Sequence, residues 1–248
     1  VHELALATLD RASGHSEAAL ARLEALTEQV HALDDDRLTA AWLHALGRSQ
    51  MWFSELAVTA VETLEDAAER FRALGLHGAA LSVDNTVAVT LLFMRDYDRG
   101  AAVNARCLEE AIARGARLME GHCLGYSGEL ALAKQQYAVA LQHYVDSAAI
   151  YTEVGIPTWL PRFNQGLCLI RLSRLEEAYA ILDAVRDQLR DTCFNRFPGM
   201  VGLQLLLCAT LLGDEDVVRE DLSYCVVLLR AIQPVSYTHL RAHETCVH

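Results

Sequence analysis

The chain has 248 residues and a formal net charge of −12, with 33 acidic and 21 basic side chains. Hydrophobic residues make up 52% of it, which excludes a disordered chain and suffices for one large core or a stack of small ones. The acidity and the lack of a basic stripe argue against a direct nucleic-acid partner. Only 4 prolines and 14 glycines stand among abundant Ala, Leu and Glu, so the chain is expected to be mostly helical.

Along the chain, a turn between two helices recurs at a step of about 40 residues. The clearest copy is Gly128–Tyr144, in which a Leu/Ala-rich run follows the glycine, Tyr137 stands at the turn, and Ala140 and Tyr144 follow. The turn position recurs at Ser16, Ala57, Tyr97, Tyr137, Leu175 and Glu215. Six near-equal helix pairs are therefore predicted.

The other copies align with Gly128, Tyr137, Ala140 and Tyr144. In chain order they offer Ala7, Ser16, Ala19 and Leu23; Ala57, Ala60 and Leu64, with Gly47 near the first-helix position; Ala88, Tyr97, Gly100 and Asn104; Gly166, Leu175, Ala178 and Leu182; and Leu206, Glu215, Val218 and Leu222. Apolar residues at i, i+3, i+4 and i+7 within these segments indicate amphipathic helices.

Helix ends are marked by residues with capping chemistry. Gly75, Gly115 and Gly155 stand where second helices are expected to end in a left-handed residue. The acidic runs 34–36 and 214–216, and Asp96, fall at inter-helix turns, where side-chain capping explains them. A calcium loop would need carboxylates at alternate positions, which these runs do not provide.

This pattern resembles the tetratricopeptide repeat (TPR) family over residues 1–234. The resemblance implies an all-α fold, a right-handed α-solenoid of antiparallel helix pairs with about six repeats of about 40 residues. Some other helical array is the alternative. The copies depart from the family where Arg48, Ala88 and Leu206 replace the first-helix glycine and where Asn104 replaces an aromatic residue. We expect those copies to be less regular.

Motifs for catalysis or for cofactors are missing from the sequence. It holds no Gly-rich phosphate loop and no nucleophile elbow. The seven cysteines form no C-x-x-C pair and suit buried thiols in a reducing compartment. His122 and Cys123 are adjacent, but neighbouring side chains diverge by about 100° on a helix, which disfavours a catalytic dyad. We expect no catalytic residue, no metal and no cofactor, and a chain that is not an enzyme.

TPR arrays bind through a concave face lined mainly by the first helix of each pair. The matching positions here are Trp52, Asn85, His122, Tyr126, Glu129, Phe163, Asn164 and Arg171. For Trp52 and Phe163, packing between helices is the stronger interpretation, whereas Asn85, Asn164 and Arg171 are balanced between packing and binding. Arg171 is the only Lys or Arg among these positions, which argues against an acidic C-terminal peptide as the ligand.

Phrases such as Gly128–Ala133 and Ile150–Gly155 resemble TPR arrays of large bacterial signalling proteins. The resemblance implies a non-enzymatic scaffold or sensor that binds a peptide or a protein partner, including another domain of the same chain. The alternative is a small-ligand sensor that controls an attached ATPase, DNA-binding, cyclase, kinase or CHAT protease domain, with a tight cavity at Tyr126, Glu129, Asn164 and Arg171. A third hypothesis, an enzyme fragment, would depend on His122. The apolar stretch 201–212 is too short to span a bilayer, so a cytoplasmic location and no membrane partner are expected.

The C-terminal residues of the chain do not follow the repeat pattern. Residues from Val235 to Thr245 resemble a translated sequencing-library adapter, so residues 235–248 are expected to be a non-native tail. The His/Cys cluster His239, His243, Cys246 and His248 is for that reason not interpreted as a zinc site. With the missing initial Met, this tail predicts that residues 1–234 are a fragment of a longer protein.

Overall fold

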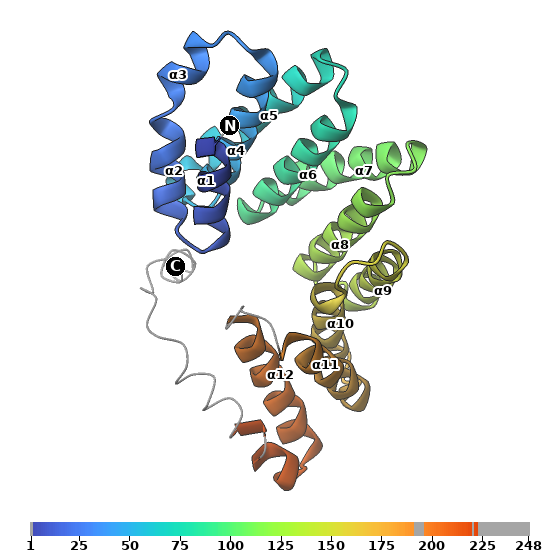
Figure 1. Cartoon of the computed structure of the whole chain (residues 1–248). Coiled ribbons are helices and arrows are strands. Elements are labelled where there is room, and N and C mark those ends of the chain that lie inside the picture. The colour runs from blue at the N-terminus through green and yellow to red at the C-terminus, as the bar shows by residue number, and fades with distance from the viewer. Residues whose placement is uncertain (1, 191–195, 220, 223–248) are drawn as a thin grey trace. The chain divides into compact units, whose positions relative to one another are not determined.

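The computed structural model describes residues 2–190, 196–219 and 221–222, and all regular structure within these ranges is helical. The chain divides into two compact units, Val1–Tyr126 and Ser127–His248, and the division falls inside one helix. Each unit is described by itself (Figure 1). The predicted tail, residues 235–248, lies outside the described residues, as do the last repeat's residues beyond Leu222.

The first unit is a succession of helices that pack against their neighbours in chain order. It contains α1 (His2–Ala12), α2 (Ser16–Glu24), α3 (Thr27–Ala32), α4 (Asp36–Gln50), the 3-10 turn η1 (Ser54–Leu56), α5 (Ala57–Ala73), α6 (His77–Phe93), α7 (Tyr97–Ala113) and the start of α8 (Arg117–Ala133). Apolar residues of α4, α5 and α6 form its largest cluster, which includes Leu64, Phe71 and Leu91.

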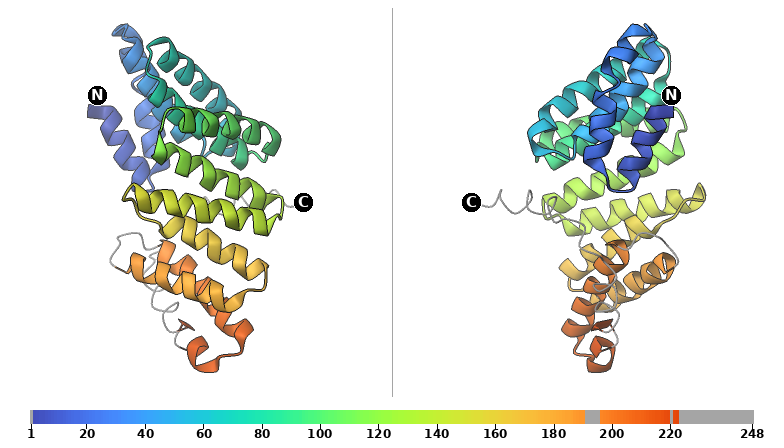
Figure 2. Two further views of the ribbon diagram at one scale, coloured as in Figure 1. Left: turned by 90° about the vertical axis from the view of Figure 1, so that its right-hand side faces the viewer. Right: turned by 60° about the vertical axis from the view of Figure 1, so that its left-hand side comes forward.

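The second unit repeats the same plan. It contains the end of α8, then α9 (Tyr137–Glu153), α10 (Trp159–Arg171), α11 (Leu175–Leu189) and α12 (Arg196–Leu212), and a further helical segment starts at Glu215. Figure 2 shows α9 to α12 stacked as successive layers. Its main cluster joins α10, α11 and α12 through residues such as Phe163, Leu182 and Leu205.

The predicted turn positions are confirmed as helix starts. Ser16, Ala57, Tyr97, Tyr137 and Leu175 are the first residues of α2, α5, α7, α9 and α11, and Glu215 begins the last described helical segment. Gly75, Gly115 and Gly155 have φ of 70°, 64° and 74°, the left-handed conformation expected at the end of a second helix. The predicted caps also form, since Asp35, Asp96 and Asp214 accept from backbone N–H groups at 3.0, 3.3 and 3.1 Å.

Small residues on the first helices make room for large ones on the second. A Cβ added at Gly128 would lie 2.6 Å from the Tyr144 ring, and one at Gly166 would lie 2.6 Å from Leu182. A Cβ added at Gly47 would likewise lie 2.6 Å from Leu64. In each case the two helices of a pair approach so closely that only glycine fits. The alanines expected to let helices approach are fully buried: Ala19, Ala60, Ala140 and Ala178.

Three buried polar side chains bond to backbone carbonyls of a neighbouring helix. Trp42 Nε1 donates to Leu23 O at 2.8 Å, Asn104 Nδ2 to Cys123 O at 3.1 Å, and Gln165 Nε2 to Tyr144 O at 3.0 Å. Asn104 therefore fits the core where an aromatic residue was expected, because its amide donor is satisfied.

Two details differ from the prediction. The second helix of the first repeat is broken into α2 and α3, with a turn at residues 25–26. In the last repeat, Leu222 was expected in the core but is 49% exposed, whereas its neighbour Asp221 is buried. Leu206 stands at the position that glycine takes in other repeats. No helix among the described residues is both long and apolar enough to cross a membrane.

Candidate functional site

One face of each first helix is set by four positions. The reference residue of each first helix is Gly47, Ala88, Gly128, Gly166 or Leu206. Two of the four positions precede it, by six and three residues, and two follow it, by one and five residues. Spacings of three and four residues place these positions on one side of a helix. We call this set the first-helix face. Its members are Ala41, His44, Arg48 and Trp52; Ser82, Asn85, Val89 and Phe93; His122, Gly125, Glu129 and Ala133; Leu160, Phe163, Leu167 and Arg171; and Met200, Leu203, Leu207 and Leu211.

In the first unit, equivalent positions of successive repeats meet. Trp52, just beyond α4, lies 5.4 Å from Phe93 at the end of α6, centroid to centroid, with the rings inclined by 43°. The two side chains are 49% and 44% exposed. Trp52 is therefore on the surface, where its ring is available for contact with a partner. Asn85 is half-buried, and its Oδ1 lies 3.9 Å from the Sγ of Cys123.

The His122–Cys123 pair has no features of a catalytic dyad. Cys123 is completely buried, and burial raises the pKa of its thiol to about 12. A thiol with that pKa stays protonated at neutral pH and is a poor nucleophile. Burial also lowers the pKa of His122. Tyr126 is buried as well, and its hydroxyl donates to the backbone carbonyl of Ala88.

In the second unit, Glu129 and Asn164 lie together. Asn164 Nδ2 donates to Glu129 Oε1 at 2.7 Å, which joins α8 to α10. Burial raises the pKa of Glu129 above its ordinary value, although the Tyr144 hydroxyl and the Asn164 amide favour the ionised carboxylate. The two remaining candidates of this unit differ in exposure. Phe163 is buried in the core, and Arg171 is exposed at the end of α10 and makes no ion pair with a described residue.

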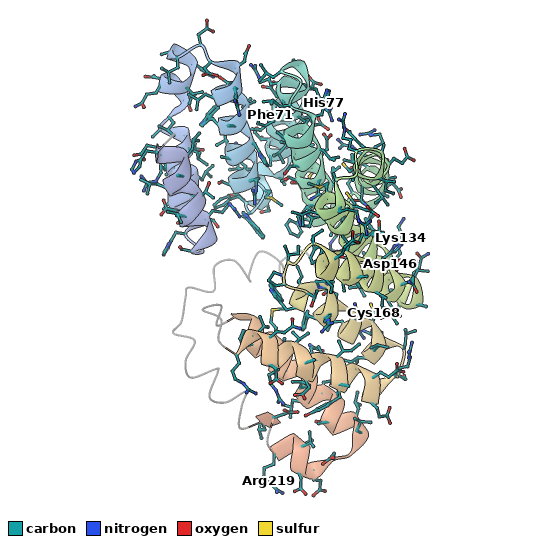
Figure 3. The ribbon with its side chains drawn as sticks, turned by 45° about the vertical axis from the view of Figure 1, so that its right-hand side comes forward. Phe71, His77, Lys134, Asp146, Cys168 and Arg219 are labelled. Atoms are coloured by element: carbon teal, nitrogen blue, oxygen red, sulfur yellow. The ribbon has the colours of Figure 1, made fainter. Side chains whose placement is uncertain are left out.

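The first-helix face of α12 is apolar and open. Met200, Leu203, Leu207 and Leu211 are 45%, 49%, 42% and 56% exposed. The equivalent residues Phe163 and Leu167 on α10 are buried and partly buried. Sequence reasoning missed this stripe, although the spacing of its members is visible in the sequence. Figure 3 shows the side chains of both units, with Cys168 on α10 marking the buried side of that helix.

A second missed group is basic. Arg11 on α1 and His44 and Arg48 on α4 line one pocket. Of these three residues, His44 and Arg48 belong to the first-helix face. The first-helix face therefore carries Arg48 in addition to Arg171. No cluster of three or more metal-ligating side chains occurs within the described parts of the chain.

No protein-family model matches the sequence, and no curated protein matches it by sequence. Solved structures do match. BtubC from P. vanneervenii superposes with a TM-score of 0.75 at 11% identity, covering 88% of this chain and 92% of its own. The signal transduction ATPase with a tetratricopeptide repeat sensor from Pyrococcus horikoshii gives 0.69 at 16% identity over 91% of this chain. This chain spans 35% of the length of that protein.

A third match is NprR in complex with its cognate peptide NprX, with a TM-score of 0.55 at 16% identity over 100% of this chain and 82% of the other. At these identities the similarity concerns the fold. The chain is an all-helical array with the TPR-like architecture that the repeat pattern predicted.

Proposed function

We propose that this chain is a protein-interaction module that binds a peptide or partner segment on the first-helix face, as part of a bacterial signalling or regulatory protein. The observation that carries the proposal is the apolar stripe Met200, Leu203, Leu207 and Leu211 on α12, whose members are 42% to 56% exposed. Four apolar side chains in a row on one rigid helix suit a partner that supplies its own apolar face.

Two further features support binding on this face. Trp52 and Phe93 present aromatic surface at one end of the face in the first unit, and aromatic residues are enriched where proteins meet partners. Exposed Arg171 supplies an unpaired charge in the second unit. Among the proteins with similar folds, NprR is bound to a peptide and the Pyrococcus ATPase uses its repeats as a sensor. We extend these roles to this chain.

The proposal is tested by selecting peptides that bind the full chain from a random display library. The dissociation constant of a selected peptide is then measured for the unmodified chain and for Leu207→Glu, by titration calorimetry. We expect Leu207→Glu to weaken binding at least tenfold, since a charge would have to be buried against an apolar partner. Val139→Glu is the matched control, because Val139 is 50% exposed but lies on α9, a second helix.

Two results would contradict the proposal. The first is a library that yields no binder at micromolar peptide. The second is a set of binders whose affinity is lowered by Val139→Glu but not by Leu207→Glu or by Trp52→Ala, because the partner would then occupy a second-helix surface.

A further inference from the structure

A pocket of about 260 Å³ opens between α1, α2 and α4 in the first unit. Its walls are apolar, formed by Leu4, Ala7, Leu23, Ala41 and Ala45, and its polar groups come from two helices. The polar members are Thr8, Arg11, His44, Arg48 and Ser49. The pocket is therefore lined by three basic side chains and two hydroxyl groups, without a carboxylate.

The two arginines of this pocket have no acidic partner among the described residues. Arg11 and Arg48 are half-buried, and their guanidinium groups make no ion pair or hydrogen bond with a described residue. Burial and the charge of Arg11 together lower the pKa of Arg48, so the two cations are close enough to repel each other. Two partly desolvated guanidinium groups without a counter-charge lower the stability of the folded chain. The chain has 33 acidic residues, but none of them lines this pocket.

His44 adds an unused hydrogen-bonding atom. Its Nε2 is buried and has no hydrogen-bond partner. Burial, Arg48 and Arg11 lower the pKa of His44 to about 4, so the ring is neutral at physiological pH. The hydroxyls of Thr8 and Ser49 are already donated to the carbonyls of Leu4 and Ala45 at 2.9 and 3.1 Å. The free donors that remain are the guanidinium groups and the imidazole.

The second charged pocket of the same unit shows the contrast. It measures about 210 Å³ and is lined by Glu65, Glu69, Arg72, Asp84 and Arg106, together with two valines. There Arg72 pairs with Asp84, and three acidic side chains outnumber two basic ones. Its charges are compensated from within, whereas those of the first pocket are not.

We propose that the pocket between α1 and α4 is a binding site for an oxyanion group, a carboxylate or a phosphate, held by Arg11 and Arg48 with His44 as an additional donor. Guanidinium groups bind both kinds of oxyanion through paired hydrogen bonds, and a partly desolvated site strengthens those bonds. The volume suits a small anion or the acidic end of a larger ligand. The site does not depend on the proposed peptide function, because its evidence is the uncompensated charge of the pocket itself.

The proposal is tested by calorimetric titration of the full chain with sulfate and with succinate at low ionic strength and pH 7. We expect saturable binding of at least one of them and a dissociation constant at least about tenfold higher in Arg11→Met and in Arg48→Met. The matched control is Arg37→Met, because Arg37 also lies on α4 and makes no ion pair with a described residue, but is exposed. Its affinity should stay within about twofold of the unmodified chain.

Thermal unfolding separates a binding role from a structural one. Without added anion, Arg48→Met should unfold at the same or a higher temperature than the unmodified chain, because it removes a repelled, half-buried charge. With sulfate, the unmodified chain should gain stability and Arg48→Met should not. A lower unfolding temperature for Arg48→Met in the absence of anion, with unchanged anion affinity, would overturn the proposal, as would no binding of either anion.

The pH dependence of sulfate affinity tests whether His44 takes part in binding, because a purely structural role of His44 would not change it. A bound anion offsets the charges of Arg11 and Arg48, which are the charged groups that face His44, and it therefore raises the pKa of that ring. Sulfate affinity should consequently rise as the pH falls from 7 to 5, and His44→Gln should remove the dependence. An affinity that is independent of pH in the unmodified chain would exclude His44 from the site.

The source of the oxyanion is separated by comparing ligands. A peptide with a free C-terminal carboxylate and its amidated counterpart are titrated beside succinate. Arg48-dependent binding of the acid alone assigns the site to a peptide terminus, and equal binding of succinate assigns it to free anions. Leu207→Glu should leave anion binding unchanged, so failure of the peptide proposal and failure of this one are distinguishable.

Discussion

At the scale of single residues, the fold depends on places where a first helix lacks a side chain. Gly128 is the clearest example, because the ring of Tyr144 fills the space that a Cβ would occupy. Tyr144 is itself almost fully buried, so it cannot move aside without leaving a cavity. A single methyl group at Gly128 must then separate α8 from α9 within the second unit.

We expect Gly128→Ala to lower the free energy of unfolding by about 1 to 3 kcal/mol, the usual effect of overpacking. Gly78→Ala is the control, since no atom lies within 4 Å of the added Cβ and φ is not positive there. It should be neutral or stabilising by up to about 1 kcal/mol, through the lower entropy of the unfolded chain. Urea denaturation of both variants measures the difference, and equal destabilisation would contradict the close contact.

Glu129 gives the stability of the protein a pH dependence. Its pKa is raised by burial in the folded state, so the native protein holds this proton to higher pH than the unfolded chain does. The contribution of Glu129 to stability therefore falls as pH rises from its unfolded pKa through the folded one. Glu129→Gln keeps an acceptor for Asn164, and we expect it to stabilise the chain at pH 7 more than at pH 4. Equal effects at the two pH values in urea titrations would exclude this ionisation.

The buried cysteines should not react with alkylating reagents in the folded protein. Burial raises the pKa of Cys107 and Cys123 to about 12 and that of Cys168 and Cys208 to about 11. Iodoacetamide at pH 8 should leave these four thiols unmodified in native buffer and label them in urea, as read by peptide mass spectrometry. Rapid native labelling of Cys123 would contradict the assignment of a buried, protonated thiol.

At the scale of the helices, a buried ion pair holds the last described segment. Arg186 on α11 lies 2.8 Å from Asp221, and the Tyr179 hydroxyl donates to the same carboxylate at 3.2 Å. The side chains of Arg186 and Asp221 are 18% and 1% exposed. The pair therefore connects α11 to the helical segment that contains Asp221.

We expect Asp221→Ala to destabilise the second unit by about 1 to 3 kcal/mol, because Arg186 would keep Asp183 as a partner but lose the buried carboxylate of Asp221. Combining it with Arg186→Met should recover a large part of that loss. Asp187→Ala serves as the control, since the Asp187–Arg190 pair is exposed and should contribute less than about 1 kcal/mol. If the double variant were no more stable than Asp221→Ala, the cost would come from packing and not from the loss of the Arg186–Asp221 ion pair.

The helices and their starts followed from the sequence because each repeat carries the same local information. Turn residues, capping aspartates and glycine ends act over a few positions, so Tyr97, Asp96 and Gly115 could be placed without a structure. The break between α2 and α3 was missed, since no proline or glycine marks it. At Arg95, Gln135 and Ser173 the first-to-second turns use positive φ, at 61°, 58° and 58°, where no glycine signals them.

The candidate site was predictable to a smaller extent. The spacing that defines the first-helix face is a property of one helix, so Trp52, Asn85, Glu129 and Arg171 could be proposed. Burial depends on the neighbouring helix, which is why Phe163 lies in the core. The basic pocket needs Arg11 and Arg48 to meet although 37 positions separate them in the sequence. That proximity is created by the packing of α1 on α4.

At the scale of the whole molecule, we expect a destabilising substitution to affect mainly the helix pair that contains it. In an array of repeats each pair is stabilised mainly by its neighbours, so a defect need not spread through the chain. Gly166→Val and Gly47→Val place the same clash in different units, against Leu182 and Leu64. By hydrogen exchange and mass spectrometry, we expect the first to speed exchange in α10 and α11 and the second in α4 and α5. A uniform increase over all helices in both variants would show a single cooperative unit instead.

The near-constant spacing of the turn residues has an evolutionary consequence. Excising residues 57–96 would join one second-helix start to the next, removing one second helix and the first helix that follows it. Chains built in this way can gain or lose length in whole repeats while every remaining helix keeps a neighbour of the usual kind. Each repeat from the second onward also has its own four positions on the first-helix face, so these side chains can vary one repeat at a time.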